Sequence, residues 1–204
     1  MARHLSPRHR NSKWRYLNPV LALMLAAGTF VCSLALPTLL CAQVKAPTEY
    51  DVKSAYLYNF GKFVRWPATQ PAEGIFSICV LGQDPFGSSL DALSRQTLDG
   101  KSVSVKRITQ PEESTGCRII FISLSEEHRL KEILAALDKK PVLTVSEMPH
   151  FSRNGGMIQF VMDGNRVRFE VNLSASENAG LTLSSELLKV ATSVKRNPQP
   201  GGGA

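Results

Sequence analysis

The chain has 204 residues, with 24 Lys and Arg against 17 Asp and Glu and a formal net charge of +7. Five of the basic residues lie within a head that has no acid, Met1–Val20. Without them, 19 Lys and Arg face 17 acids, a net charge of +2, and no cluster of basic and aromatic residues follows residue 66. The charge therefore does not indicate nucleic-acid binding.

The first 42 residues predict a secretory signal peptide. A basic head precedes the apolar run Leu21–Ala42, which is broken late by Pro37 and ends in a small residue. The alternative is an uncleaved membrane anchor, because the run approaches the ~20 residues that a span needs. In both cases the early charges leave the remainder outside the cytoplasm. We expect a periplasmic protein with one folded domain over residues 43–195 and a disordered tail over 196–204.

The cysteines divide between the two parts. Cys32 and Cys41 leave with the signal peptide, and Cys79 and Cys117 remain. An even number in an exported chain favours a disulfide, and two separately buried thiols are the alternative. Two cysteines and two distant histidines do not have the spacing of zinc ligands, so we expect no metal and no cofactor.

The mature part opens with a predicted helix, Glu49–Trp66, which Pro67 ends. Its rings could form a ligand platform, but helical spacing places most of them in the core. Tyr58 and Trp66 are the best candidates for a solvent-facing surface. The predicted inner stripe consists of Val52, Tyr56, Phe60, Phe63 and Val64.

Strands and helices then alternate. A buried strand and a glycine turn lead into a helix with Asp84 as its cap, which begins a βαβ unit. Neither a glycine-rich fingerprint nor GK[ST] follows, so the turn gives little support for phosphate binding. A second helix has Ser125 as its cap. The expected elements are strand Ile75–Leu81, helix Pro85–Ser94, edge strand Lys101–Ile108, strand Arg118–Leu124, helix Ser125–Lys139 and strand Pro141–Val145.

The stretch Gly155–Leu173 predicts a β-hairpin around Asp163-Gly164-Asn165. Apolar and polar residues alternate along both strands, so either register places the apolar set on one face. That set is Ile158, Phe160, Met162, Val167, Phe169 and Val171. A short helix, Ala175–Ala179, follows with Asn172 or Ser174 as its cap, and a final helix spans Thr182–Thr192.

This order predicts an α/β fold. We expect an open mixed sheet of five to six strands, parallel in the middle with an antiparallel hairpin at one end, and helices on both faces.

Catalytic patterns are missing from the sequence. A nucleophile elbow, G-x-S-x-G, does not occur, and the mature histidines, His128 and His150, lie in a first helical turn and a loop. Asp163 and Glu170 are separated by roughly 23 Å at strand rise, too far for a carboxylate pair. The residues alone indicate an exported α/β domain that binds something and is not an enzyme.

Six segments resemble the YfiR family of periplasmic regulators, from about Tyr50 to Ala191. They are VKSAYLYNFGKFVRWP at 52–67, FSICVLG at 76–82, CRIIFIS at 117–123, PVLTVSE at 141–147, IQFVMDGNRVRFEVNL at 158–173 and GLTLSSELLKVA at 180–191. The resemblance implies a single-domain, non-catalytic α/β protein whose family disulfide falls on Cys79 and Cys117. A second family disulfide would lie near Ser146–Gly156, where this chain has no cysteine.

The resemblance also implies a partner, the periplasmic sensor domain of a membrane diguanylate cyclase whose synthesis of cyclic-di-GMP the regulator represses. One alternative is a small-ligand binding module that serves another receptor, such as a histidine kinase, and another is an enzyme. Whether the protein forms a homodimer is left open. We expect Glu170 and Leu173 to contribute to the partner-binding surface, because Glu170 projects from the polar face of its strand. In the alternative, Glu170 pairs with a Lys or Arg across the sheet and Leu173 is core.

Overall fold

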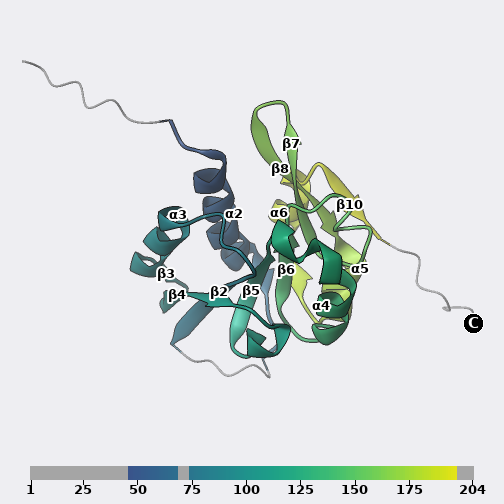
Figure 1. Ribbon diagram of the computed structural model, residues 1–204, viewed down its shortest axis with the longest axis horizontal. Helices are drawn as coiled ribbons and strands as arrows, with labels where there is room; N and C mark the ends of the chain where they lie inside the picture. Colours follow the sequence, from purple (N-terminus) through teal and green to yellow (C-terminus); the bar gives the residue numbers. More distant parts are fainter. Residues whose placement is uncertain (1–45, 69–73, 197–204) are drawn as a thin grey trace, which may run out of the picture. The chain divides into compact units, whose positions relative to one another are not determined.

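The computed structural model describes residues 46–68 and 74–196. The predicted signal peptide, its cleavage site and most of the predicted tail lie outside the described residues. Figure 1 shows the main sheet with helices on both of its faces. The predicted α/β class with a mixed sheet is therefore confirmed.

The main sheet has eight strands in the order β10-β8-β7-β6-β5-β2-β4-β3, more than the five to six expected. The strands from β4 through β2, β5 and β6 to β7 pair in parallel, whereas β7 and β8 form the antiparallel hairpin. β10 adds to β8 in parallel and β3 to β4 antiparallel. The strands are β2 Ile75–Leu81, β3 Thr97–Leu98, β4 Lys101–Ile108, β5 Cys117–Ile122, β6 Leu143–Ser146, β7 Ile158–Asp163, β8 Arg166–Asn172 and β10 Ser193–Lys195.

The first helix is shorter than expected. α2 spans Glu49–Phe63, and a capping box between Thr48 and Asp51 fixes its start. The prediction that it reaches Trp66 is wrong, because β1 (Val64–Arg65) pairs with β9 (Thr182–Leu183) in a separate two-stranded sheet. Phe63 is consequently 38% exposed and does not belong to the inner stripe.

The middle helices also differ from their predicted bounds. Asp84 does not cap a helix; its Oδ1 accepts from the Phe86 N–H, and the helix begins at Ser88. Ser123, not Ser125, caps the next helical segment. The segments are α3 Ser88–Asp91, the 3-10 helices η2 Ala92–Arg95, η3 Pro111–Ser114 and η4 Leu124–Arg129, and α4 Leu130–Ala136.

The predicted final helix, Thr182–Thr192, is confirmed only in its middle, where α6 spans Ser185–Val190 with Ser184 as its cap. Its first two residues form β9, and β10 follows directly after Thr192. The preceding helix, α5, spans Leu173–Asn178 and has Asn172 as its cap, one of the two caps expected.

Two apolar clusters cover the two faces of the sheet. Alternate residues of β2 separate between them: Ile78 and Val80 face α2, while Cys79 and Leu81 face α4. The larger cluster includes Phe60, which lies beside Phe160 and Phe169 of the hairpin with ring centroids 5.9 and 5.2 Å away.

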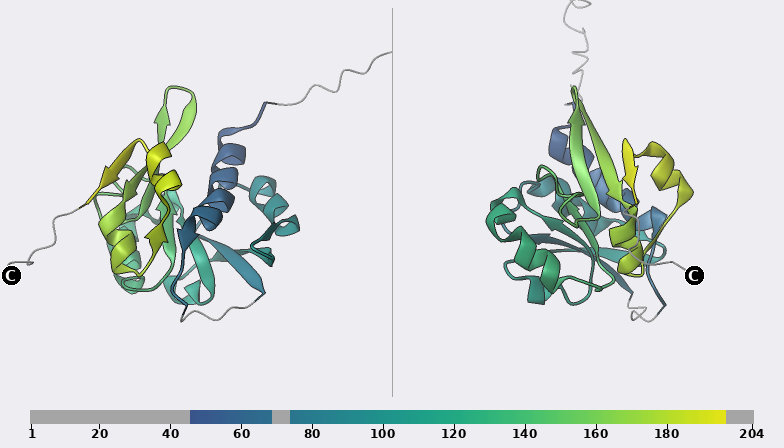
Figure 2. Two further views of the ribbon diagram at one scale, coloured as in Figure 1. Left: turned by 180° about the vertical axis from the view of Figure 1, so that it is seen from behind. Right: turned by 90° about the vertical axis from the view of Figure 1, so that its right-hand side faces the viewer.

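The hairpin forms as predicted, in the register that places Gly164 and Asn165 in the turn, with Phe160 opposite Phe169 and Met162 opposite Val167. Gly164 has φ +58°, the positive angle that the turn requires. Figures 1 and 2 show the hairpin tip rising beyond the other strands, beside the N-terminal half of α2. Met162, predicted to face inward, is 48% exposed because the tip extends past the core.

Candidate functional site

The carboxyl ends of β2 and β5 form the switch point of the parallel sheet, since β4 and β6 lie on opposite sides of this pair. Ligands of open α/β sheets bind in the crevice at such a point. Gly82 follows β2 with φ +89°, and a Cβ there would lie 2.5 Å from Glu126 Oε1 and 2.6 Å from Ser125 Oγ. The crevice beside Gly82 is thus filled by the protein's own side chains.

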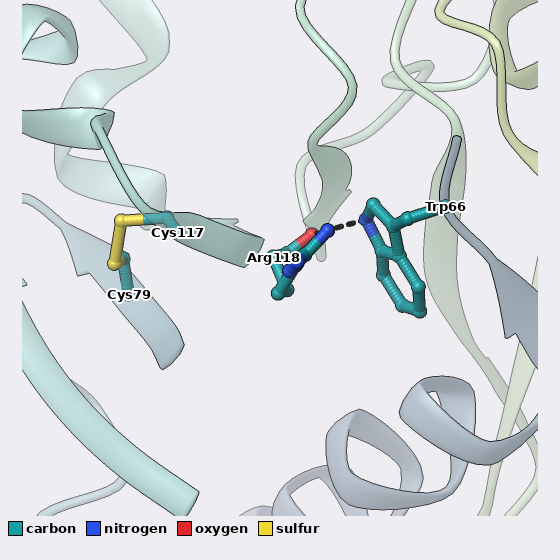
Figure 3. Close-up of a disulfide and its surroundings, with 4 residues drawn as sticks. All are labelled: Trp66, Cys79, Cys117 and Arg118. Atoms are coloured by element: carbon teal, nitrogen blue, oxygen red, sulfur yellow. Dashed lines mark hydrogen bonds between the residues drawn. A yellow bond between two sulfur atoms is a disulfide. The ribbon is translucent and has the colours of Figure 1, made fainter. Parts of the chain in front are cut away.

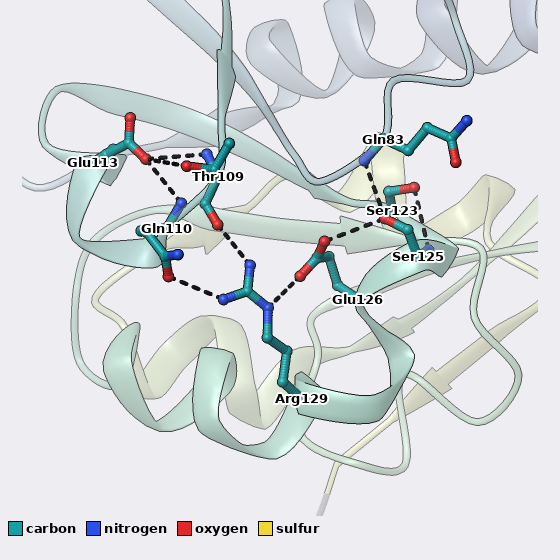
Figure 4. A network of polar contacts seen from close by, with 8 residues as sticks. All are labelled: Gln83, Thr109, Gln110, Glu113, Ser123, Ser125, Glu126 and Arg129. Atoms are coloured by element: carbon teal, nitrogen blue, oxygen red, sulfur yellow. Dashed lines mark hydrogen bonds and ion pairs between the residues drawn. The ribbon is translucent and has the colours of Figure 1, made fainter.

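Figure 4 shows how these side chains satisfy one another. The Gln83 N–H donates to Ser125 Oγ at 3.0 Å, and that hydroxyl donates to Glu126 Oε1 at 3.2 Å. Arg129 forms an ion pair with Glu126 and donates to Thr109 O at 2.6 Å and to Gln110 Oε1 at 3.0 Å. A phosphate in this crevice would meet a carboxylate that is only 8% exposed, so the usual nucleotide position of the fold is closed.

The disulfide joins the two central strands. Cys79 of β2 and Cys117 of β5 are bonded with a Cα–Cα distance of 5.9 Å, and Figure 3 shows the bridge between the strands. Both residues are buried, 0% and 3% exposed. The structure therefore agrees with a disulfide and not with separate thiols.

A cavity of about 470 Å³ lies on the other side of Arg118, around the predicted solvent-facing Trp66. The Trp66 indole N–H donates to the Arg118 carbonyl at 3.2 Å (Figure 3), and the ring stands edge-on to Phe76 at 5.4 Å. The charged lining was not predicted from the sequence, because its residues come from separate segments of the chain. The lining includes Arg65, Trp66, Phe76, Asp99, Lys101 and Arg118.

Tyr58, the other predicted surface ring, does not line this cavity. Its hydroxyl donates to the Thr97 carbonyl at 2.7 Å, and Lys62 Nζ lies 4.5 Å from the ring centroid. Tyr58 therefore ties α2 to β3 instead of presenting a free face.

Glu170 lies in a polar network on the hairpin. Its Oε2 accepts from Lys195 Nζ of β10 at 2.9 Å and from Ser152 Oγ at 3.1 Å. The hydrogen bond from Lys195, with smaller help from Ser152 and the charge of Arg153, holds the pKa of Glu170 below its ordinary value. The side chain is 27% exposed, so it pairs across the sheet and still reaches solvent.

Leu173 is 6% exposed and belongs to the larger apolar cluster. Of the two alternatives for this residue, the structure supports core packing. The expected pair, an acid beside an exposed apolar anchor, is therefore not present at the surface. A role of Glu170 in binding a partner stays a prediction.

Lys53 is a charged residue that the sequence did not single out. It is 2% exposed and forms ion pairs with Glu49, one turn earlier, and with Glu147 after β6. Burial alone would lower the pKa of Lys53, but the hydrogen bonds to Glu147 and Glu49 outweigh it and raise the pKa. The triad anchors α2 beside the base of the hairpin, where Lys53 Nζ lies 6.0 Å from the Phe160 ring centroid.

Other reactive groups show no assembled centre. Neither 46–68 nor 74–196 contains a group of three His, Cys, Asp or Glu side chains able to hold a metal, and His128 and His150 are both exposed. In the same ranges we find no helix of the length and hydropathy needed to cross a membrane.

Comparison with known families supplies the assignment. The sequence model of the YfiR/HmsC-like family matches residues 50–192, most of the chain. The chain belongs to the YfiR/HmsC-like family. The predicted family resemblance is confirmed, and the match covers both the hairpin and the disulfide of this YfiR/HmsC-like protein.

Two solved structures are similar at low identity. A conserved domain protein from Vibrio cholerae O1 biovar El Tor shares 12% identity with a TM-score of 0.49 over 72% of this chain. An ABC domain from Streptococcus pneumonia in complex with L-Trp shares 11% identity with a TM-score of 0.44 over 59% of this chain. The YfiR/HmsC-like chain spans only 60% and 55% of these two proteins, respectively.

Proposed function

We propose that this protein is an exported, non-enzymatic regulator that binds the periplasmic sensor domain of a membrane signalling protein. The observation that carries the proposal is the family match over residues 50–192. In this proposal the partner is a diguanylate cyclase, and binding keeps its output of cyclic-di-GMP low. Glu170, partly exposed on the hairpin, contributes to the docking surface, and Leu173 supports it from the core.

Two features of the site support a binding role over a catalytic one. The crevice at the ends of β2 and β5 is closed by the Glu126–Arg129 network, so the usual position for a substrate is occupied. The two histidines of the described residues are exposed, and neither belongs to a group of side chains able to hold a metal.

Capture from membranes tests this function. Mature protein carrying a C-terminal tag is incubated with detergent-solubilised membranes of the native bacterium, and the captured proteins are identified by mass spectrometry. The proposal predicts a membrane cyclase or another sensor whose periplasmic domain binds when purified. Absence of a membrane signalling protein at native expression levels contradicts it.

A small-ligand sensor is the second candidate, and the cavity around Trp66 favours it. Its volume of about 470 Å³ and its mixture of aromatic walls with Arg65, Lys101 and Arg118 suit a flat, negatively charged molecule. Native mass spectrometry of freshly purified protein tests this role. A bound small molecule that a Trp66→Ala variant loses supports it, whereas identical masses for native and denatured protein oppose it.

A further inference from the structure

A groove runs between the start of α2 and the outer edge of β8 near the hairpin tip. It encloses about 380 Å³ and lies on the side of β8 away from β7. Figure 2 shows the two walls, α2 and the hairpin, rising side by side. The lining includes Val52 and Tyr56 from α2, and Met162, Arg166, Val167 and Arg168 from the hairpin.

The outer edge of β8 is only partly covered. β10 pairs with β8 from Glu170 to Asn172, and the Thr192 N–H donates to the Phe169 carbonyl. Alternate residues of a strand direct their backbone groups to the same edge. The backbone groups of Val167 therefore point to the same edge as those of Phe169, but into the groove and not toward β10. The Val167 carbonyl accepts a long bond, 3.4 Å, from the Tyr56 hydroxyl. Within the described strands, none pairs with this edge between Arg166 and Arg168.

The groove carries positive charge that the described residues do not neutralise. Neither Arg166 nor Arg168 has a carboxylate within ion-pair distance in the part of the chain that is described, although Asp163 lies opposite Arg166 in the register. The groove's acid, Glu49, is already paired with Lys53. The Arg168 Nε is buried and has no hydrogen-bond acceptor. A buried donor without an acceptor is costly, so rotation of the Arg168 guanidinium toward a bound carboxylate would be favourable.

Apolar surface accompanies these cations. Met162 is 48% exposed at one end of the groove, and Val52 and Tyr56 are half-buried in its wall. Exposed apolar side chains next to unpaired guanidinium groups are typical of a protein interface, in which Arg and Met are enriched. Two cations are few for a nucleic acid or another polyanion, whose binding depends on many phosphate contacts.

We propose that this groove binds an extended acidic segment of the partner's periplasmic domain. Apolar side chains of the segment cover Met162 and Val52, and its carboxylates pair with Arg166 and Arg168. The inference rests on the proposed function, because it describes where the membrane partner docks and with what chemistry. It also places the centre of docking nearer to the hairpin tip than Glu170, whose charge Lys195 already matches.

Peptide binding tests the chemistry without knowledge of the partner. Two fluorescent peptides of equal length, leucine alternating with glutamate and leucine alternating with lysine, are titrated with the mature protein at low ionic strength. The acidic peptide should bind at least about tenfold more tightly than the basic one, and salt should weaken its binding. Equal binding of the two peptides overturns the proposal.

Variants locate the binding. Arg166→Glu with Arg168→Glu should lower the affinity for the acidic peptide by about tenfold or more, while Lys131→Glu at an exposed cation of α4, outside the groove, should leave it unchanged. Equal losses in both proteins overturn the proposal. Thermal unfolding controls for folding, and Arg166→Gln with Arg168→Gln replaces the double reversal if that variant unfolds.

The captured membrane partner separates this inference from the proposed function. If the wild-type protein captures no membrane signalling protein, the proposed function fails. If the purified partner domain binds wild-type protein and the Arg166→Glu, Arg168→Glu variant equally well, only the groove is excluded as the docking site. Loss of binding in that variant, with retention in Lys131→Glu, supports both.

Discussion

The switch point of the sheet and the hairpin tip differ in how their charges are satisfied. At the ends of β2 and β5, Glu126 and Arg129 pair with each other and with backbone and side-chain partners, and the disulfide holds the same two strands together. At the tip, Arg166 and Arg168 have no ion-pair partner among the described side chains, and Met162 is half-exposed.

The difference indicates which region is a scaffold and which is available to a partner. Buried polar groups that form hydrogen bonds with one another make a region rigid, and they have no free donor or acceptor for a ligand. Unpaired cations beside apolar surface can gain binding energy when another molecule supplies carboxylates and apolar side chains.

Removing the disulfide should have the largest effect on the scaffold. Cys79→Ser with Cys117→Ser opens a covalent loop with a sequence separation of 38 residues. The chain-entropy model assigns such a loop a stabilisation of about 3–4 kcal/mol. Denaturant unfolding of the oxidised wild type and the double variant measures it, and mass spectrometry of the non-reduced wild type must show no free thiol. Equal stabilities would show that the bridge does not constrain the scaffold.

Leu173→Ala should destabilise the protein by about 2–3 kcal/mol, because Leu173 is 6% exposed and its removal leaves a cavity in the larger cluster. Leu124→Ala is the matched control, since Leu124 is 50% exposed. Urea unfolding should separate the two variants clearly. If both variants lose a similarly small amount of stability, Leu173 is not a core residue and is again a candidate for the docking surface.

Arg129→Met should lower the free energy of unfolding by about 1–3 kcal/mol, because it leaves the Glu126 carboxylate, 8% exposed, without its cation. A further Glu126→Gln substitution should restore part of that stability by removing the unpaired charge. If Arg129→Met alone has no effect, the closed network is not what stabilises the switch point.

Glu170→Gln should have the smallest effect, about 1 kcal/mol or less near neutral pH, since the ion pair with Lys195 is partly exposed. The folded protein holds the pKa of Glu170 below its ordinary value of 4.5. As the pH falls, the unfolded state therefore binds the proton at a higher pH than the folded state does. The contribution of Glu170 to the free energy of unfolding is thus complete above the unfolded pKa. It is lost as the pH falls through the lower, folded pKa. Unfolding of wild type and Glu170→Gln should converge in acid; a constant difference would exclude this linkage.

Local patterns predicted the parts of the fold whose pairing depends on neighbouring residues. Alternation along Gly155–Leu173 identified the hairpin and its two faces, and the apolar runs identified β2 and β5. The disulfide followed from the number of cysteines and the expected export. A period-two pattern could not show that the tip projects past the core, so Met162 was placed on the wrong side.

Long-range pairing was beyond the sequence. Thr182–Leu183 and Ser193–Lys195 are too short to carry a strand pattern, and they are strands because β1 and β8 lie beside them. The helical spacing of Leu183 and Leu187 therefore favoured one helix over both residues, whereas only Leu187 lies in α6. Lys53 likewise looks like a surface residue until the fold brings Glu147 to it from 94 residues away.

The position of the candidate binding surfaces was only partly predictable. Trp66 lines a cavity although it also packs against the larger apolar cluster, and the Lys101 and Arg118 that share this cavity come from two later strands. Arg166 and Arg168 were placed on the polar face of the hairpin. That they lack partners could not be inferred, because it depends on which acids the fold brings near them.

Cellular cyclic-di-GMP measured in the native bacterium tests the central claim most directly. Deleting the gene should raise cyclic-di-GMP roughly several-fold, because loss of the repressor shifts the cyclase toward its active state. Exported wild-type protein and Lys131→Glu should restore the low level, whereas an equally abundant Arg166→Glu, Arg168→Glu protein should not. An unchanged level after deletion would contradict repression of a cyclase, and full restoration by the double variant would contradict docking through the hairpin groove.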